Sequence, residues 1–176
     1  MKIICIGRNY ADHISELNNE RPTEPVIFMK PDSAILPNKN PFVIPAFSND
    51  IHHEVEILVK ICKVGKHIDA KFANKYYEEI GLGIDFTARD VQSRLKEKGL
   101  PWEKAKAFDH SAVIGSFTSK KNYTSLENIN FELKSKGTTV HEGNTSLMLV
   151  KIDELIAYVS QYDTVKIGDI IFTGTP

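Results

Sequence analysis

The sequence is dominated by short runs of β-branched and other apolar residues, and clusters of Pro, Gly and Asn separate these runs. Examples are "KIICIG", "PVIFMK", "VEILVKICKV", "HSAVIGSF" and "DIIFTG". Such runs, bounded by turn-forming residues, are typical of β-strands. Because helical patterns are few and do not alternate regularly with strands, a parallel βαβ architecture is disfavoured. We therefore expect an α+β protein that is predominantly β, a mixed sheet roll or sandwich with a few short helices.

Helical patterns occur in four segments, residues 10–19, 69–80, 87–99 and 151–162. In the third segment, Thr87 is a candidate N-cap and Gly99 a candidate C-cap. In the fourth, Ile152, Leu155, Ile156 and Val159 recur at helical spacing. This apolar stripe predicts a helix with one buried face.

The chain of 176 residues is long enough for one domain with a proper core, and it contains no repeat or linker. We expect a single domain over residues 1–176. A formal net charge of -1 with scattered lysines argues against nucleic-acid and membrane partners. Cys5 and Cys62 lie inside apolar runs and predict reduced thiols rather than a disulfide framework. With no signal-like segment at the start, these features favour a cytoplasmic protein.

The octapeptide "DIHHEVEI" places ionisable side chains in a predicted strand. Strand alternation puts His52, Glu54 and Glu56 on one face. Two neighbouring carboxylates repel each other, and burial raises their pKa values unless a cation lies between them. Taken alone, the octapeptide also fits an edge strand with a solvated acidic face.

Asp85 ends the apolar run "IGLGIDF" immediately before the third helical segment. An aspartate at such a position often serves only as a turn or cap residue. Together with Glu54 and Glu56, however, it would complete a set of three oxygen ligands. Carboxylates without cysteine suit Mg²⁺ or Mn²⁺ before Zn²⁺, although His52 on the same face leaves Zn²⁺ open.

Seven segments, in this order and spacing, resemble the fumarylacetoacetate hydrolase family, and most closely its small acylpyruvate hydrolase and oxaloacetate decarboxylase branch. They are "GRNYADHISE", "FMKPDSAI", "DIHHEVEI", "GIDFTARDVQ", "KGLPWEKAKAFD", "EGNTS" and "GDIIFTGTP". The resemblance extends from residue 3 to residue 176. It implies a β-sandwich roll that forms a homodimer. It also implies one Mg²⁺ or Mn²⁺ per chain, held by Glu54, Glu56 and Asp85.

The resemblance also implies roles for further residues. Matching positions that bind substrate in the family are Arg8, Tyr10, Lys30, Arg89, Gln92 and Thr175. Lys106 is expected in the pocket as a catalytic residue. His13 and Glu16, three residues apart in a short lid helix, are expected to activate a water molecule. A neutral imidazole is a suitable general base at neutral pH, and the glutamate would fix its tautomer.

The implied activity is hydrolysis of a carbon–carbon bond in small 2,4-dioxo acids such as acylpyruvates and fumarylpyruvate-like compounds. Expelling an enolate requires stabilisation of negative charge on a chelated oxygen, which a divalent ion provides. Oxaloacetate decarboxylation, or enol–keto isomerisation or hydration of a 2-oxo acid, is the alternative on the same chelate. The non-enzymatic alternative is a relative that keeps the metal and ligand sites but is inactivated by loss of the family's C-terminal strand.

The sequence departs from the family pattern in two places. Relatives normally continue past "TGTP" into a further strand, whereas this sequence ends at Pro176. We therefore expect the family's terminal strand to be missing, which would leave an exposed edge at residues 169–173 or one covered by a partner chain. The second departure is His141, where relatives usually carry glutamine. Its role is left unassigned.

Overall fold

The computed structural model describes residues 1–176 except 12, 13 and 15–21. Its strands are β1 (Ile3–Gly7), β2 (Val26–Lys30), β3 (Ile51–Ile61), β4 (Tyr77–Ala88), β5 (Ala112–Ser119), β6 (Asn130–Ser135), β7 (Thr138–Asn144) and β8 (Ile170–Phe172). The described helices are α2 (Ala70–Ala73), α3 (Arg89–Glu97), α4 (Glu103–Lys106) and α5 (Ile152–Tyr162), with short 3-10 turns η1 (Asp32–Ala34), η2 (Lys120–Asn122) and η3 (Thr145–Leu147).

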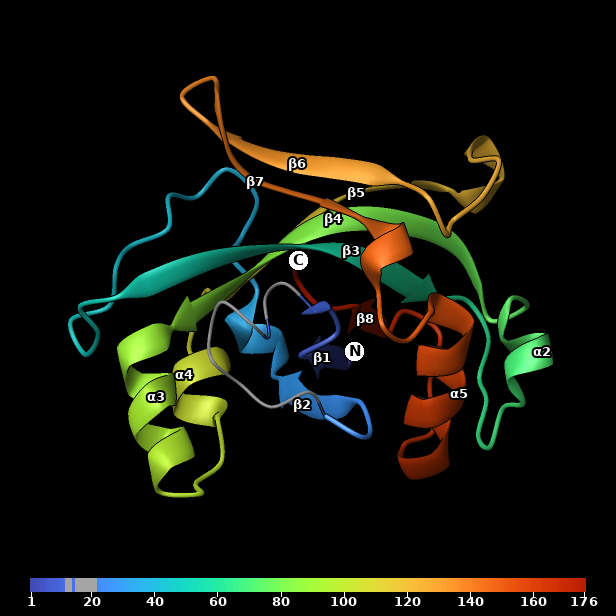
Figure 1. The fold of residues 1–176 in the computed structure, drawn as a ribbon, viewed down its shortest axis with the longest axis horizontal. Helices are drawn as coiled ribbons and strands as arrows, with labels where there is room; N and C mark the ends of the chain where they lie inside the picture. Colours follow the sequence, from blue (N-terminus) through green and yellow to red (C-terminus); the bar gives the residue numbers. More distant parts are fainter. Residues whose placement is uncertain (12–13, 15–21) are drawn as a thin grey trace.

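The main sheet has six strands in the order β2-β1-β8-β3-β4-β5, and β6 and β7 form a separate antiparallel hairpin. In Figure 1 the long strands β3 and β4 arch over β1, β2 and β8, and the hairpin lies above the arch. An isolated parallel bridge joins Ile35 to Ala112, where the Leu36 N–H donates to the Ala112 carbonyl at 2.8 Å. This bridge links the segment after β2 to β5, so the curled sheet closes into a roll. The predicted β-rich roll is confirmed.

Side chains of β3 alternate between two apolar regions. Val55, Ile57 and Val59 belong to a core that also contains residues of α5 and Phe131 of the hairpin. On the opposite face, Leu58 packs with Ile3, inside the roll. Because Glu54 and Glu56 have the same parity as Leu58, their side chains enter the roll as well.

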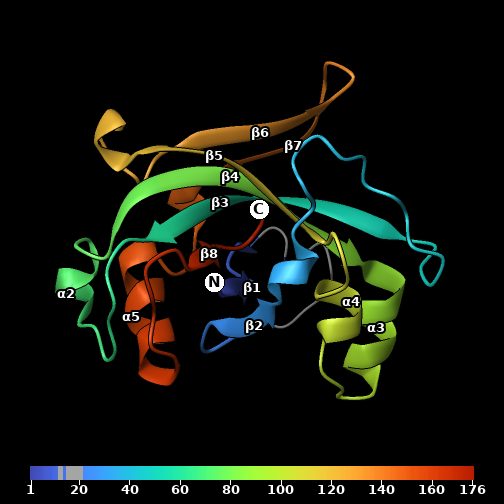
Figure 2. The same cartoon turned by 180° about the vertical axis from the view of Figure 1, so that it is seen from behind.

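Helices cover the two ends of the arch. Figures 1 and 2 show α3 and α4 below one end and α2 and α5 below the other. The predicted stripe of α5 is buried, since Ile152 is 6% exposed and Leu155, Ile156 and Val159 are each 0% exposed. No described helix is long and apolar enough to cross a membrane.

Two helix boundaries differ from the sequence prediction. The segment 69–80 is not one helix, because α2 ends at Ala73 and β4 begins at Tyr77. Pairing of β4 with both β3 and β5 supplies its backbone hydrogen bonds and overrides the local helical preference. Thr87 is not the N-cap of α3; it belongs to β4, and Ala88 precedes the helix. Gly99 has φ +63, as expected for a residue just after a helix.

The expectation of an exposed edge at residues 169–173 is wrong. β8 lies inside the sheet, parallel to β1 and antiparallel to β3. Phe172 is fully buried and is the register partner of both Cys5 and Leu58. The C-terminal segment therefore forms part of the floor of the roll, and its backbone pairs on both sides.

Candidate functional site

Strand register brings the three predicted acids together. Glu54 is the partner of Asp85 across β3 and β4, and Glu56 is the partner of Gly83. Partners in an antiparallel pair point to the same face, so the carboxylates converge inside the roll. Ligand atoms of Glu54, Glu56 and Asp85 lie within 4.8 Å of one another, and all three residues are buried. This separation is short enough for one cation.

Gly83 leaves the space that this arrangement needs. A Cβ atom at Gly83 would lie 2.5 Å from the Val113 carbonyl oxygen and 2.8 Å from Leu58 Cδ1. Both distances are shorter than real Cβ contacts, so a larger residue would push β4 away from β5 or displace Leu58. The register that aligns Asp85 with Glu54 therefore depends on a glycine at this position.

Three cationic side chains contact two of the acids. Lys106 Nζ lies 2.6 Å from Glu54 Oε2 and 2.7 Å from Asp85 Oδ2, and Lys30 Nζ lies 2.7 Å from Asp85 Oδ1. Arg89 donates from Nη2 to Glu54 Oε1. Burial alone would lower the pKa of Lys106, but the Asp85 and Glu54 carboxylates outweigh it and raise that pKa above its ordinary value. Lys106 is therefore a buried cation paired with two carboxylates.

Glu56 has a different environment. Its Oε2 accepts a hydrogen bond of 2.7 Å from the Gly174 N–H, and the described residues place no cationic side chain in hydrogen-bonding contact with it. Burial first and the Asp85 charge second raise the pKa of Glu56 well above its ordinary value. A divalent cation would supply the missing positive charge. The donors are all oxygens, which suits a hard ion such as Mg²⁺ or Mn²⁺.

His52 does not join the acids. Its Nε2 lies 3.3 Å from Asp50 Oδ1, and its side chain is 43% exposed. The described acid cluster thus lacks the imidazole that would have favoured Zn²⁺.

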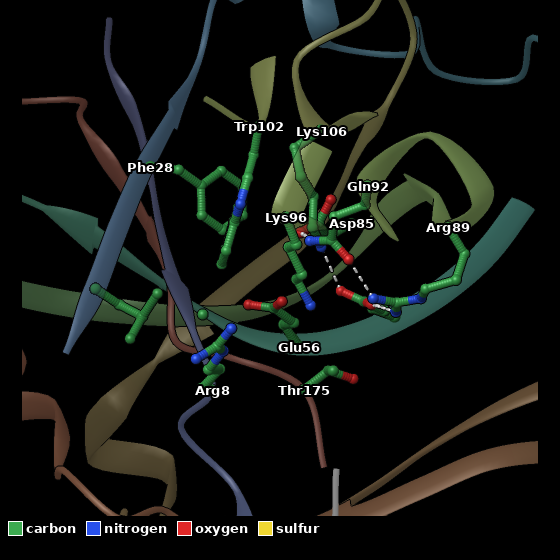
Figure 3. Close-up of a pocket in the computed structure, with 13 residues that line it drawn as sticks. Arg8, Phe28, Glu56, Asp85, Arg89, Gln92, Lys96, Trp102, Lys106 and Thr175 are labelled. Carbon is green, nitrogen blue, oxygen red and sulfur yellow. Dashed lines mark hydrogen bonds and ion pairs between the residues drawn. The ribbon is translucent and has the colours of Figure 1, made fainter. Parts of the chain in front are cut away.

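A narrow cavity of about 30 Å³ opens beside the carboxylates. Besides the acids it is bounded by charged, polar and aromatic groups, namely Arg8, Phe28, Arg89, Gln92, Lys96, Trp102, Lys106 and Thr175. Figure 3 shows these side chains gathered around one space. They come from β2, β3, β4, α3 and α4, from the residues just after β1 and just before α4, and from the C-terminal segment. The pocket is therefore rich in cations and suited to a small anion.

Arg89 and Gln92 form the predicted pair on one face of α3. Arg89 Nη1 lies 2.5 Å from Gln92 Oε1, and both residues are buried. The Arg89 N–H donates to the Asp50 carbonyl at 2.8 Å, which joins the start of α3 to the start of β3. This backbone hydrogen bond holds the first residue of α3 close to β3, and the Arg89 guanidinium then reaches Glu54.

Not all of the predicted substrate-binding residues reach the pocket. Arg8 and Thr175 line it, and Thr175 Oγ1 also donates to the Val55 carbonyl at 3.0 Å. Lys30 does not line the pocket. Its ammonium contacts Asp85 and lies 3.0 Å from Ser111 Oγ. Tyr10 is 1% exposed and packs in the apolar core instead. His13 and Glu16 lie outside the described residues.

Several residues of the pocket wall were not predicted from the sequence, and among them are Lys96 and Trp102. Lys96 follows Arg89 by seven residues and Gln92 by four, so it lies on the same face of α3. That spacing could have identified it. Trp102 lies in the motif "KGLPWEKAKAFD", but nothing in its local pattern marks it as a pocket residue.

His141 contacts the strand that carries the two glutamates. The Val55 N–H approaches His141 Nδ1 at 3.4 Å, and His141 Nε2 lies 3.2 Å from the Pro176 carbonyl oxygen. These partners fit a neutral ring with its proton on Nε2. The imidazole therefore joins β7 to β3 at the residue between Glu54 and Glu56.

Comparison with known proteins agrees with this site. The family model "Fumarylacetoacetate (FAA) hydrolase C-terminal" matches residues 2–176. The chain is 42% identical over 174 residues to the mitochondrial oxaloacetate tautomerase FAHD1 of Bos taurus, covering 99% of this chain and 79% of that protein. It is 43% identical over 176 residues to the mitochondrial oxaloacetate decarboxylase of Dictyostelium discoideum, covering 99% of this chain and 81% of that protein.

Among solved structures, the fumarylpyruvate hydrolase from Pseudomonas aeruginosa in complex with Mn²⁺ and pyruvate superimposes with a TM-score of 0.92 and 30% identity. That match covers 100% of this chain and 78% of the other. The relatives named here are enzymes of small 2-oxo acids, and each match covers at least 99% of this chain. The chain belongs to the fumarylacetoacetate hydrolase family.

Proposed function

We propose that this chain is a Mg²⁺- or Mn²⁺-dependent enzyme of small 2-oxo acids, and that its first substrate is oxaloacetate, which it tautomerises or decarboxylates. The observation that carries this proposal is the buried group of Glu54, Glu56 and Asp85 at the end of a cation-rich pocket. The names of the two curated relatives support oxaloacetate as the substrate.

Glu54, Glu56 and Asp85 would hold the ion, one per chain. When bound, a divalent ion polarises a 2-oxo group as a Lewis acid and stabilises negative charge on the enolate oxygen. The relative from Pseudomonas aeruginosa binds Mn²⁺ and pyruvate, which supports an ion next to a 2-oxo acid on this fold.

The chain's own residues would bind and orient the substrate. Arg89, held by Gln92, offers a planar guanidinium suited to a carboxylate. Lys106 remains protonated between Glu54 and Asp85, so it adds fixed positive charge where the enolate forms. Both reactions of oxaloacetate pass through such an enolate, and neither consumes water at the carbon that reacts.

Hydrolysis of acylpyruvates is the second candidate. The Pseudomonas aeruginosa relative is named a fumarylpyruvate hydrolase, and hydrolysis would use the same chelating acids. It additionally needs a base for water, the role proposed for His13 with Glu16. The third alternative, a non-catalytic relative, rested on a damaged sheet. β8 pairs on both sides in this structure, so that reason is not supported.

One set of assays separates these functions. The purified chain is incubated with Mg²⁺ or Mn²⁺, and enol absorbance of oxaloacetate, pyruvate release and acetylpyruvate absorbance are followed separately. Accelerated enol loss without pyruvate indicates a tautomerase, and pyruvate release indicates a decarboxylase. Loss of acetylpyruvate indicates a hydrolase. If none of the three responds to metal, the proposed enzyme function is wrong.

The homodimer and the cytoplasmic location remain predictions. Val43, Ile44 and Phe47 are 72%, 68% and 51% exposed and form an apolar stretch before β3. Such a stretch suits a contact with a second copy. Light scattering on the purified chain would test the dimer.

A further inference from the structure

The edge of β3 that faces β8 changes its partners just before the two glutamates. Among the described residues, β8 pairs with β3 at residues 58–60. Further toward Glu56, the Ile57 carbonyl accepts from the Thr173 N–H at 3.1 Å and from Thr173 Oγ1 at 2.9 Å. Individual side-chain and backbone donors therefore take over from the regular strand pairing, and the segment after β8 turns toward the pocket.

Val55, the residue between Glu54 and Glu56, is held on this edge by side chains. Its carbonyl accepts from Thr175 Oγ1 at 3.0 Å, and its N–H donates to His141 Nδ1 at 3.4 Å. Val55 is 2% exposed, and a buried backbone N–H needs an acceptor. The imidazole thus completes the hydrogen bonds of the residue that separates two proposed metal ligands.

The other ring nitrogen of His141 contacts the C-terminal segment. His141 Nε2 lies 3.2 Å from the Pro176 carbonyl oxygen and 3.5 Å from Thr175 Oγ1. Thr175 lines the pocket, and the Gly174 N–H donates to Glu56 Oε2 at 2.7 Å. One imidazole therefore contacts two segments that bring groups to the acid site, namely β3 and the C-terminal segment.

A bulge in the hairpin directs this ring. Leu133 pairs with His141 and Lys134 pairs with Thr139, so Val140 is an extra residue in β7. Such a bulge bends a strand and re-aims neighbouring side chains, and bulges are frequent next to active sites. Figures 1 and 2 show the hairpin above β3 and the C-terminus. The bulge therefore directly precedes the β7 residue that contacts β3.

A glycine lets the C-terminal segment lie against β7. A Cβ atom at Gly143 would clash with Pro176 Cγ and would lie 2.8 Å from Phe131 Cζ. A larger residue there would push the hairpin away from the C-terminal segment and lengthen the contacts of His141. The bulge and the glycine are two separate departures from a regular hairpin, and both favour the same placement of the imidazole.

We propose that His141 is a positioning residue for the metal site. By accepting from Val55 and donating to the C-terminal segment, it sets the spacing of Glu54 and Glu56 and the position of Thr175. This inference deepens the proposed function and rests on the acids holding the ion. His141 is not among the described residues that line the pocket or form the acid cluster, so it acts through its neighbours.

Two substitutions separate the hydrogen bonds of His141 from its volume. Phe keeps a ring without nitrogen, whereas the amide of Gln can both accept from Val55 and donate to the C-terminal segment. We expect His141→Phe to weaken Mn²⁺ binding by roughly tenfold or more, as loss of a residue that supports metal ligands usually does. His141→Gln should keep most of the wild-type affinity.

Titration calorimetry with Mn²⁺ measures both affinities, at a temperature at which circular dichroism shows each variant to be folded. A change in affinity is then distinct from a loss of folded protein. Glu142→Gln is the control on the hairpin, because Glu142 is the next residue of β7 and is exposed. It should bind Mn²⁺ as the wild type does.

A second measurement uses the wild-type ring. In a long-range ¹H–¹⁵N spectrum of the metal-free protein at pH 8, His141 should carry its proton on Nε2, because Nδ1 accepts from Val55. Comparison with the His141→Gln spectrum assigns its signals. Adding Mg²⁺, which is diamagnetic, should shift the Nδ1 signal, since the ion would draw together the two glutamates on either side of Val55.

Wild-type Mn²⁺ affinity in His141→Phe would overturn the proposal, and so would an equal loss in His141→Phe and His141→Gln. A wild-type ring with its proton on Nδ1, or an Nδ1 signal that ignores Mg²⁺, would refute it even if His141→Phe does not fold. A loss of Mn²⁺ affinity confined to His141→Phe, in a protein that converts no 2-oxo acid, would uphold this inference and refute the proposed function. A wild-type chain that binds no Mn²⁺ would refute both.

Discussion

Glu54 and Asp85 face each other directly across β3 and β4, and Lys106 Nζ lies within 2.7 Å of a carboxylate oxygen of each. Like charges opposite each other in a sheet are destabilising, so this register requires a cation. Lys106, together with Lys30 at Asp85 and Arg89 at Glu54, supplies this positive charge in the protein itself. Glu56 lies beside the pair without such a partner among the described residues, so a divalent ion would stabilise the folded protein chiefly through Glu56.

Asp85→Asn should abolish binding of Mn²⁺, because it removes one ligand charge and frees Lys30 and Lys106 to repel the ion. Isothermal titration calorimetry with Mn²⁺ measures this directly. Glu79→Gln is the matched control, since Glu79 lies on the same strand but pairs with Lys60 at 2.8 Å outside the site. Mn²⁺ affinity that is unchanged in Asp85→Asn would refute the assignment of the metal ligands.

Lys106→Met should destabilise the metal-free protein by about 3–5 kcal/mol, the usual cost of leaving buried charges without their partner. Mn²⁺ should recover much of this loss, because the ion then neutralises Glu54 and Asp85. Urea denaturation with and without Mn²⁺ gives both numbers. Lys104→Met, an exposed lysine on the same short helix, should change stability little. A variant as stable as wild type without metal would contradict the charge argument.

His13→Ala should reduce acylpyruvate hydrolysis by roughly 10²–10⁴-fold if His13 is the general base, while Mn²⁺ binding stays intact. Oxaloacetate decarboxylation should be affected much less, since its carbon–carbon cleavage needs no activated water. Initial rates on both substrates provide the comparison, and His53→Gln, at an exposed residue near the start of β3, is the control. Hydrolysis at the wild-type rate in His13→Ala would exclude this residue as the base.

We expect the environment of Asp169 to make the free energy of unfolding fall in acid. Asp169 lies at the start of β8, where burial alone would raise its pKa, but the Lys2 ammonium and the N–H groups of Lys2 and Lys166 lower that pKa below its ordinary value. A carboxylate with a lowered folded-state pKa stabilises the fold above about pH 4, its unfolded value. That contribution disappears as the pH falls through the folded-state pKa.

Urea denaturation at several pH values between 7 and 3 tests this expectation. Asp169→Asn should be less stable than wild type at pH 7 by about 1–3 kcal/mol, because a charged acceptor of several hydrogen bonds is lost. The difference should shrink below pH 4. An exposed acid, changed in Asp109→Asn, is the control. A difference in the free energy of unfolding between wild type and Asp169→Asn that stays constant down to pH 3 would contradict the lowered pKa of Asp169.

Much of the acid site could be predicted from the sequence, because strand alternation already places Glu54 and Glu56 on one face. Helix α5 was predictable for the same reason, since its apolar stripe is local. The position of β8 was not, because pairing Ile170 with Ile3 joins opposite ends of the chain and leaves no local signal. Tyr10 was expected at the pocket from its motif, but a large aromatic side chain gains more from the apolar core. Lys96 was not predicted, although its spacing from Arg89 and Gln92 places all three on one face of α3.

Gly174 connects the C-terminal segment to the acid site. Its φ is +98, and a Cβ atom there would lie 2.8 Å from Asn9 Cβ, while its N–H donates to Glu56. Gly174→Ala should therefore destabilise the protein and weaken Mn²⁺ binding together, because the displaced backbone carries away the hydrogen bond to Glu56. Gly168→Ala is the matched control, since a Cβ atom at Gly168, which has φ +86, would have no neighbouring atom within 4 Å.

Both substitutions incur backbone strain of about 1–2 kcal/mol, but only Gly174→Ala adds a clash next to the proposed metal ligand Glu56. Denaturation and Mn²⁺ calorimetry on the two variants separate strain from site damage, and equal Mn²⁺ affinity in both would show that the Gly174 contact does not position Glu56.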